Sequence, residues 1–180
     1  MKTLFSVLII FLSISVSAQV SQVTLQASGL TCSMCNNAIS KALKTLPFAQ
    51  SVTSDISSAS FDISVKPGSK VNFDDIKKKV EGAGFSVSSM KAVVHFDDQK
   101  IVNDGHINAG GMAFHFLNVK DQTLNGDKTL QVLDKGFVSA KTFAKNAVYT
   151  KMECYKTGVA GSCCAKDNLA AGTRIYHVTI

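Results

Sequence analysis

The chain has 180 residues, of which 46% are hydrophobic, and it carries a net charge of +6 at pH 7 from 19 Lys and Arg against 13 Asp and Glu. The basic excess is mild, and its densest run, residues 77–79, has acidic neighbours on the same predicted helix, so the composition gives no support for a nucleic-acid-binding surface. We identify no hydrolase triad, paired-carboxylate site or phosphate-binding glycine-rich loop in the sequence, and we therefore expect a protein that is not an enzyme.

The first 18 residues have the pattern of a secretory signal peptide. One charged residue, Lys2, precedes an apolar stretch from Leu4 to Val16, and small residues lead to a cleavage site after Ala18. This stretch is shorter than the about twenty apolar residues that a membrane helix needs, and no later segment is apolar enough to span a bilayer. We therefore expect an exported protein, periplasmic or secreted, with no membrane anchor after cleavage.

The remaining length suits one generous domain or two small ones, and we favour two, 19–96 and 97–180. In the first, apolar residues either alternate as in strands or recur at helical spacing. The predicted elements are a strand at 20–26, a helix at 35–46, strands at 50–56 and 60–65, a helix at 72–83 with Asn72 as its cap, and a strand at 85–96. This order over about 75 residues predicts a ferredoxin-like βαββαβ domain of the α+β class.

Residues 97–180 change character, because short strand-like segments alternate with turn residues. We expect strands at 113–120, 129–133, 137–139, 147–154 and 174–180, while 141–146 fits either a short helix or a turn. Several short strands at this spacing predict a small all-β barrel or sandwich, whose role the sequence does not indicate.

Cys32 and Cys35 stand three residues apart where a strand and loop enter the first predicted helix. Backbone amides and the positive end of the helix dipole stabilise thiolates at such a place. Two thiolates are enough for linear or trigonal Cu(I), and Hg(II) has the same preference, whereas Zn(II) needs further donors that this loop does not contain. The pair therefore predicts a soft-metal site, for which Cu(I) is the best fit.

Residues 29–35, which read Gly-Leu-Thr-Cys-Ser-Met-Cys, resemble the Gly-Met-x-Cys-x-x-Cys signature of heavy-metal-associated domains. That family occurs in copper chaperones, in copper ATPases and as the periplasmic mercury-binding protein. The resemblance extends over residues 20–96, where the buried positions of both helices also match. Leu30 replaces the usual Met of the family, a side chain that packs under the loop and does not coordinate, so a Leu of similar volume costs little.

The resemblance implies that Cys32 and Cys35 are the metal ligands and that Phe85 lies near the metal loop. It also implies a metal-transporting ATPase or another metal-binding protein as the partner. Together with the predicted export, it favours a carrier that transfers or sequesters Cu(I), with ligand exchange as the route of transfer.

Other classes of function stay open. A thiol–disulfide oxidoreductase would use Cys32 as its nucleophile, but thioredoxin-like motifs usually have a Trp before the pair and a cis-proline facing it. This chain has no Trp, and its two prolines, Pro47 and Pro67, fall at a helix end and in a hairpin loop. The pair could also form an inert disulfide. A further alternative is an interaction module whose second domain binds an envelope partner, with the first domain as its regulator.

Five cysteines are an odd number for a protein that is expected to be exported. The other three, Cys154, Cys163 and Cys164, allow either one disulfide that closes a short loop or a second metal site assisted by Met152, and we favour the disulfide. The four histidines are scattered along the chain. Alternation along its predicted strand indicates that His115 faces solvent.

Overall fold

A computed structural model describes residues 19–29 and 33–180, so the expected leader (1–18) and Cys32 lie outside the described residues. Among the helices within these two ranges, none is long and apolar enough to cross a membrane. The strands are β1 (Val20–Ser28), β2 (Ala49–Asp55), β3 (Ser60–Val65), β4 (Ser86–Ile101), β5 (Gly105–Ala109), β6 (Met112–Phe116), β7 (Gln122–Val132) and β8 (Ile175–Thr179). The helices are α1 (Ser33–Lys44), α2 (Phe73–Gly82), α3 (Ala140–Asn146) and α4 (Cys154–Thr157), with 3₁₀ helices η1 (Ala147–Tyr149) and η2 (Ser162–Asp167).

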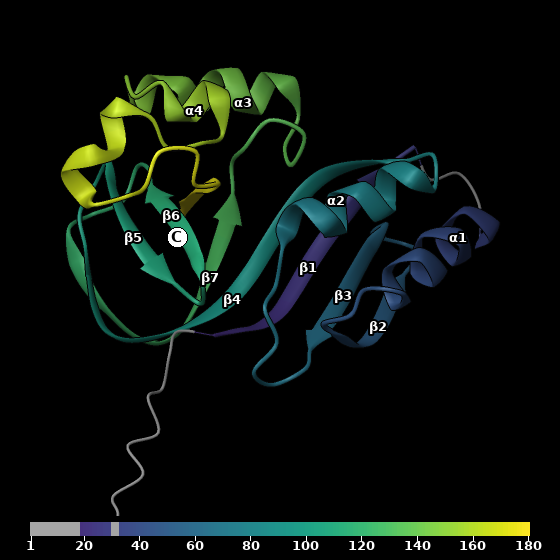
Figure 1. Cartoon of the computed structure of the whole chain (residues 1–180). Helices are drawn as coiled ribbons and strands as arrows, with labels where there is room; N and C mark the ends of the chain where they lie inside the picture. Colours follow the sequence, from purple (N-terminus) through teal and green to yellow (C-terminus); the bar gives the residue numbers. More distant parts are fainter. Residues whose placement is uncertain (1–18, 30–32) are drawn as a thin grey trace, which may run out of the picture.

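The first half has the predicted ferredoxin-like arrangement. Its strands lie in the order β2-β3-β1-β4 with antiparallel pairing, and α1 and α2 cover one face of this part of the sheet (Figure 1). The predicted alternation in β1 is confirmed, because Val23 and Leu25 are fully buried. The predicted cap of α2 is confirmed as well, since the Asp74 N–H donates to Asn72 Oδ1 at 2.9 Å.

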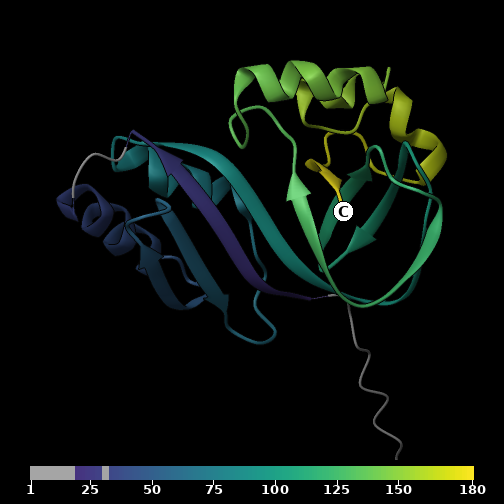
Figure 2. The ribbon, with the colours of Figure 1, turned by 180° about the vertical axis from the view of Figure 1, so that it is seen from behind.

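The strand β4 crosses the predicted domain boundary at residue 96. It pairs with β1 along Ser86–Val94 and with β7 along Lys91–Ile101, so the sheet continues into the second half without interruption. The complete order is β2-β3-β1-β4-β7-β8-β6-β5, and β4 is visible from behind as the ribbon that passes between the halves (Figure 2). The order of its six elements still predicts that the segment 19–96 folds alone.

The second half is rich in strands but is not all-β. Its strands extend the sheet of the first half, with β6 and β8 parallel, and so a separate barrel or sandwich is not confirmed. The strand that we expected at 147–154 is wrong, since η1 and the start of α4 occupy this segment. The expected strand at 137–139 is reduced to one isolated bridge between Lys135 and Val138. The segment that fitted a helix or a turn is the helix α3, which Ser139 caps through the Thr142 N–H.

Two side chains at the start of β8, Tyr176 on the strand and Arg174 just before it, tie the two halves together. The Arg174 guanidinium donates to Asp74 Oδ2 at 2.8 Å, and the Tyr176 hydroxyl donates to Asn72 Oδ1 at 3.0 Å or Asp74 Oδ2 at 3.1 Å. Beneath these polar contacts, the Tyr176 ring lies 4.8 Å from the ring of Phe73 on α2. The beginning of α2 therefore packs on a strand that comes about a hundred residues later in the chain.

Candidate metal centre

The described part of the first cysteine motif is the beginning of α1. Strand β1 ends at Ser28, and Gly29 then turns the chain with φ +86°, a left-handed conformation that favours glycine. Cys32 lies outside the described residues, so the distance between the two predicted ligands is not described. Cys35 lies in the first turn of α1 and is half-buried.

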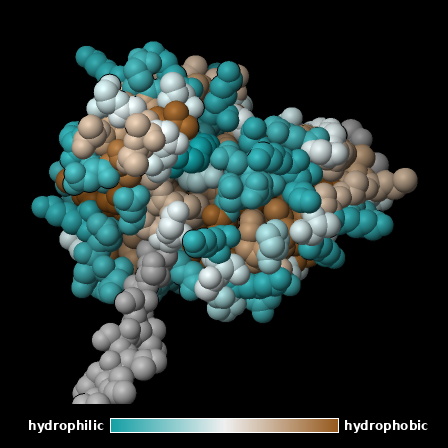
Figure 3. Space-filling model, in the orientation of Figure 1, coloured by the Kyte–Doolittle hydropathy of each residue, from teal (hydrophilic) through white to brown (hydrophobic). Residues whose placement is uncertain are grey.

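The surroundings of Cys35 suit a thiolate that meets another molecule. The described first turn of α1 has no acidic residue that would oppose a thiolate, and the helix dipole favours negative charge there. Met34 is 81% exposed, and hydrophobic side chains gather at this tip of the molecule, over the start of α1 (Figure 3). Phe85 lies beside the turn, since a Cβ on Gly29 would stand 3.9 Å from its ring. Phe85 thus lies beside the residue at which the loop begins, while residues 30–32 lie outside the described residues, so its predicted place next to the metal stays a prediction.

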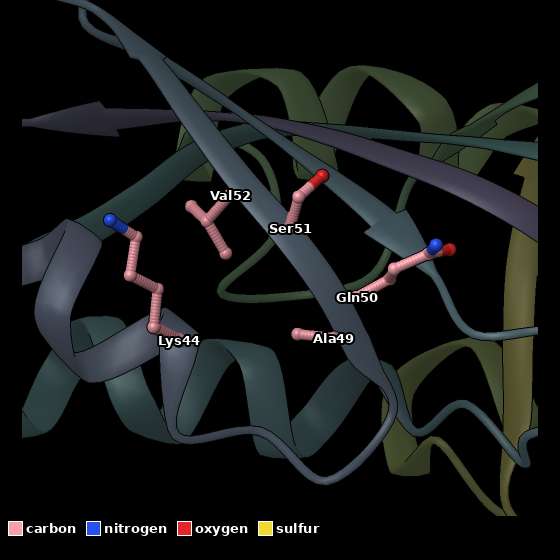
Figure 4. A pocket seen from close by; sticks show the side chains of 5 residues that line it. All are labelled: Lys44, Ala49, Gln50, Ser51 and Val52. Carbon is pink, nitrogen blue, oxygen red and sulfur yellow. The ribbon is translucent and has the colours of Figure 1, made fainter.

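A shallow pocket of about 370 Å³ lies at the opposite end of the same helix. Figure 4 shows its lining side chains between the last turn of α1 and β2. They are Lys44, Ala49, Gln50, Ser51 and Val52, none of which is a usual ligand for a soft metal. We therefore assign no metal-binding role to this pocket.

The structure brings the three distal cysteines together. Cys154 begins α4 and is buried, while Cys163 and Cys164 lie in η2, and the three sulfur atoms are within 4.8 Å of one another. The Sγ atoms of Cys163 and Cys164 are 3.3 Å apart. The structure shows no disulfide among these three described residues, so the disulfide that we favoured stays an alternative.

Two histidines lie beside Cys154, and neither was predicted from the sequence to be near a cysteine. His106 and His115 contribute ring nitrogens within 4.8 Å of Cys154 Sγ. The expectation that His115 faces solvent is wrong, because every residue of β6 is buried and alternation therefore does not distinguish an exposed face. A usable signal was present, since His106 and His115 are equidistant from the Gly110-Gly111 turn and pair directly across the β5–β6 hairpin.

Burial dominates the protonation behaviour of the cluster. Burial lowers the pKa of His106 and lowers that of His115 to about 3, with neighbouring imidazoles adding to the effect on His115, so both rings are neutral near pH 7. Burial raises the pKa of the Cys154 thiol. Burial also acts to raise the pKa of Cys163, but hydrogen bonds outweigh this effect and lower the pKa. The largest of these contributions comes from a hydrogen bond with the backbone of Cys154.

Residues 24–86 match the heavy-metal-associated domain family. Among solved structures, the first half is similar to the yeast copper transporter domain Ccc2a, with 28% identity over 36% of this chain and 88% of that one and a TM-score of 0.33. It is also similar to a copper-binding domain of a P-type ATPase, with 25% identity over 38% of this chain and 90% of that one and a TM-score of 0.35. A third similar structure is the CopZ metallochaperone, with 24% identity over 37% of this chain and 98% of that one and a TM-score of 0.35. No curated protein matches the chain significantly.

Proposed function

Since residues 24–86 match the heavy-metal-associated domain family, we propose that this chain is an exported protein that binds one Cu(I) ion through Cys32 and Cys35 and passes it on or sequesters it. The observation that carries the proposal is the position of Cys35. Cys35 lies within the matched range and in the first turn of α1, six residues after Gly29, where the helix dipole stabilises a thiolate. Export rests on the signal-like pattern of residues 1–18.

Cu(I) is the cation that best suits two thiolates with no other donor. It accepts linear or trigonal sulfur coordination, whereas Zn(II) in proteins is almost always four-coordinate. Hg(II) shares the preference of Cu(I), so the two metals compete for the same pair. In each case both thiols lose their protons on binding, and the oxidation state of the metal does not change.

Transfer requires that a partner can reach the metal, and Cys35 is only half-buried. A thiolate of the partner first bonds to the metal and gives a three-coordinate intermediate, after which one bond from the metal to Cys32 or Cys35 breaks. The exposed Met34 provides an apolar contact surface beside the cysteines, where a partner can dock. A metal-transporting ATPase or another metal-binding protein that offers its own thiolates is the partner this chemistry requires.

The proposal is tested by a Cu(I) competition titration of the reduced, leaderless chain against a chromogenic chelator. Changing Cys32→Ser or Cys35→Ser should lower the affinity of the transferable site by several orders of magnitude, because a single thiolate is left. Ser33→Ala is the matched control, since Ser33 stands between the two cysteines at the start of α1, and it should bind as the wild type does. Unchanged affinity and stoichiometry in the Cys32→Ser/Cys35→Ser double variant would place the copper elsewhere and refute the assignment.

A further inference from the structure

Three histidines form a row across adjacent strands of the second half. His106 on β5 pairs with His115 on β6, and His115 pairs in turn with His177 on β8. The rings of His106 and His115 are stacked with centroids 4.1 Å apart, and those of His115 and His177 are 5.0 Å apart. All three side chains are completely buried. Such a row concentrates imidazole nitrogens in a place that water does not reach.

Each ring is anchored by a carboxylate through one nitrogen. Asp167 Oδ2 lies 2.6 Å from His106 Nδ1, and Asp104 Oδ1 lies 2.9 Å from His115 Nε2. Because an ionised carboxylate only accepts, the bonded nitrogen carries the proton and the other nitrogen keeps a free lone pair. The same arrangement, a carboxylate behind each imidazole, is characteristic of histidines that bind metals.

The two free nitrogens face one sulfur atom. His106 Nε2 lies 3.7 Å from Cys154 Sγ, and His115 Nδ1 lies 3.8 Å from the same atom. In a tetrahedral site with metal bonds of about 2.0 Å to nitrogen and about 2.3 Å to sulfur, such ligands stand about 3.5 Å apart. The observed separations are thus close to those of a bound metal.

The short helix η2 completes the donor set. It contributes Cys163 and Cys164, which form a second group with Cys154, and it also carries Asp167, the residue that anchors His106. The group of His106, His115 and Cys154 and the group of Cys154, Cys163 and Cys164 share only Cys154, so one of the η2 thiolates has to approach the histidine nitrogens when a metal binds. We infer that His106 Nε2, His115 Nδ1, Cys154 Sγ and one thiolate of Cys163 or Cys164 form a second metal site that binds a d¹⁰ cation, Zn(II) or Cu(I). His106, His115, Cys154 and Cys164 are buried, so this site retains its metal and fixes η2 and α4 to the β5–β6 hairpin.

The donor set explains more of the geometry than a disulfide does. A bond from Cys154 to Cys163 or Cys164 would use the sulfur atoms but would leave His106 Nε2 and His115 Nδ1 as buried acceptors beside a group that cannot donate, which costs free energy. A metal satisfies both nitrogens and the thiolates together. His177 supports a polar role for this face, because its Nε2 is buried and has no hydrogen-bond partner among the described residues.

The test uses the full leaderless chain with Cys32→Ser and Cys35→Ser, so that metal bound at α1 does not contribute. The reduced protein is loaded anaerobically with Zn(II), Cu(I) or Co(II) and then freed of weakly bound metal. We expect one tightly bound ion per chain, Co(II) spectra with sulfur-to-metal charge transfer and tetrahedral d–d bands, and both nitrogen and sulfur neighbours in X-ray absorption spectra. Zn(II) and Cu(I) are distinguished by which ion the protein retains when both are supplied.

Variants in this background assign the ligands. His106→Gln or Cys154→Ser should abolish stoichiometric retention, whereas His95→Gln should not, because His95 forms an exposed pair with Asp127 away from the cluster. If circular dichroism shows that Cys154→Ser does not fold, Asp167→Asn replaces it in the test. This variant loses the carboxylate that anchors His106, and we expect it to bind Co(II) about 10- to 100-fold more weakly.

Three results would overturn the inference. They are the absence of stoichiometric metal in the folded double variant, an X-ray absorption spectrum with sulfur neighbours alone, and a disulfide from Cys154 to Cys163 or Cys164 that persists when reduced protein is reoxidised with metal present. None of these results bears on copper at Cys32 and Cys35, which the test protein lacks.

Discussion

The contact between β8 and the beginning of α2 can be tested by Tyr176→Phe, which removes one hydroxyl and keeps the ring. The ring should stay packed against Phe73 and Phe137, since neither contact involves the hydroxyl. What is lost is the hydrogen bond that the hydroxyl donates to Asn72 Oδ1 or Asp74 Oδ2, together with the longer one, 3.4 Å, that it accepts from the Asp74 N–H. The substitution therefore isolates the polar link between the two halves of the sheet.

The expected loss of stability is small but measurable. A hydrogen bond to a charged group contributes about 1.5–3 kcal/mol. Asp74 keeps its ion pair with Arg174, and its side chain is 28% exposed, so water partly replaces the hydroxyl. We therefore expect the free energy of unfolding to fall by about 1–2 kcal/mol, toward the lower end of that range.

Urea unfolding of the reduced chain in the presence of a chelator, followed by far-UV circular dichroism, measures this change. Tyr149→Phe is the matched control, because Tyr149 is 36% exposed, and it should change stability by less than about 0.5 kcal/mol. A double-mutant cycle with Asp74→Asn should give a coupling energy above about 0.5 kcal/mol. If Tyr176→Phe changes stability no more than the control does, the hydroxyl does not link the halves. If the cycle shows no coupling, Asp74 is not the acceptor, and Asn72 Oδ1 remains.

The Asp74 ion pair makes stability depend on pH: burial acts to raise the pKa of Asp74, but hydrogen bonds and charge from Arg174 lower it below the ordinary 3.8. The ion pair therefore stabilises the fold fully above pH 3.8, and this stabilisation is lost as the pH falls through the lowered pKa of Asp74. The stability advantage of the wild type over Asp74→Asn should shrink in acid, and a constant difference down to about pH 2 would contradict this. The fragment 19–96 should give a mixed helix and strand spectrum but unfold at lower urea than the full chain, because it lacks β7 and Tyr176; equal midpoints would refute the dependence. Metal should protect Cys32 and Cys35 from oxidation in air, so both should alkylate after the metal is stripped under nitrogen, whereas air-exposed apoprotein should not react there. Equal alkylation of the two samples would argue against the metal.

The first half could be predicted because its determinants are local. The alternation of apolar and polar residues correctly indicated that Val23 and Leu25 are buried, and the side chain of Asn72 caps the helix that directly follows it. Each of these features depends on residues within one or two turns or on one face of one strand. The order of the elements then left few ways to close the four-stranded sheet.

The second half could not be predicted in the same way, because its structure depends on distant contacts. Cys154 meets His106 across 48 positions in sequence and His115 across 39, and no local periodicity records such a pairing. Alternation failed for His115 because β6 lies between β5 and β8 with both faces covered. The 147–154 segment was assigned as a strand from its apolar residues, yet Val148 is 79% exposed on η1.

The central claim, that Cu(I) binds to Cys32 and Cys35, is tested most directly by X-ray absorption at the copper edge. The reduced, leaderless chain is loaded with less than one equivalent of Cu(I), and the same is done for the Cys32→Ser/Cys35→Ser variant. We predict two or three sulfur neighbours and no nitrogen for the wild type, and a clear change of the spectrum in the variant as copper moves to the His106, His115 and Cys154 cluster or stays unbound. Nitrogen neighbours in the wild type, or identical spectra for the two proteins, would contradict the account.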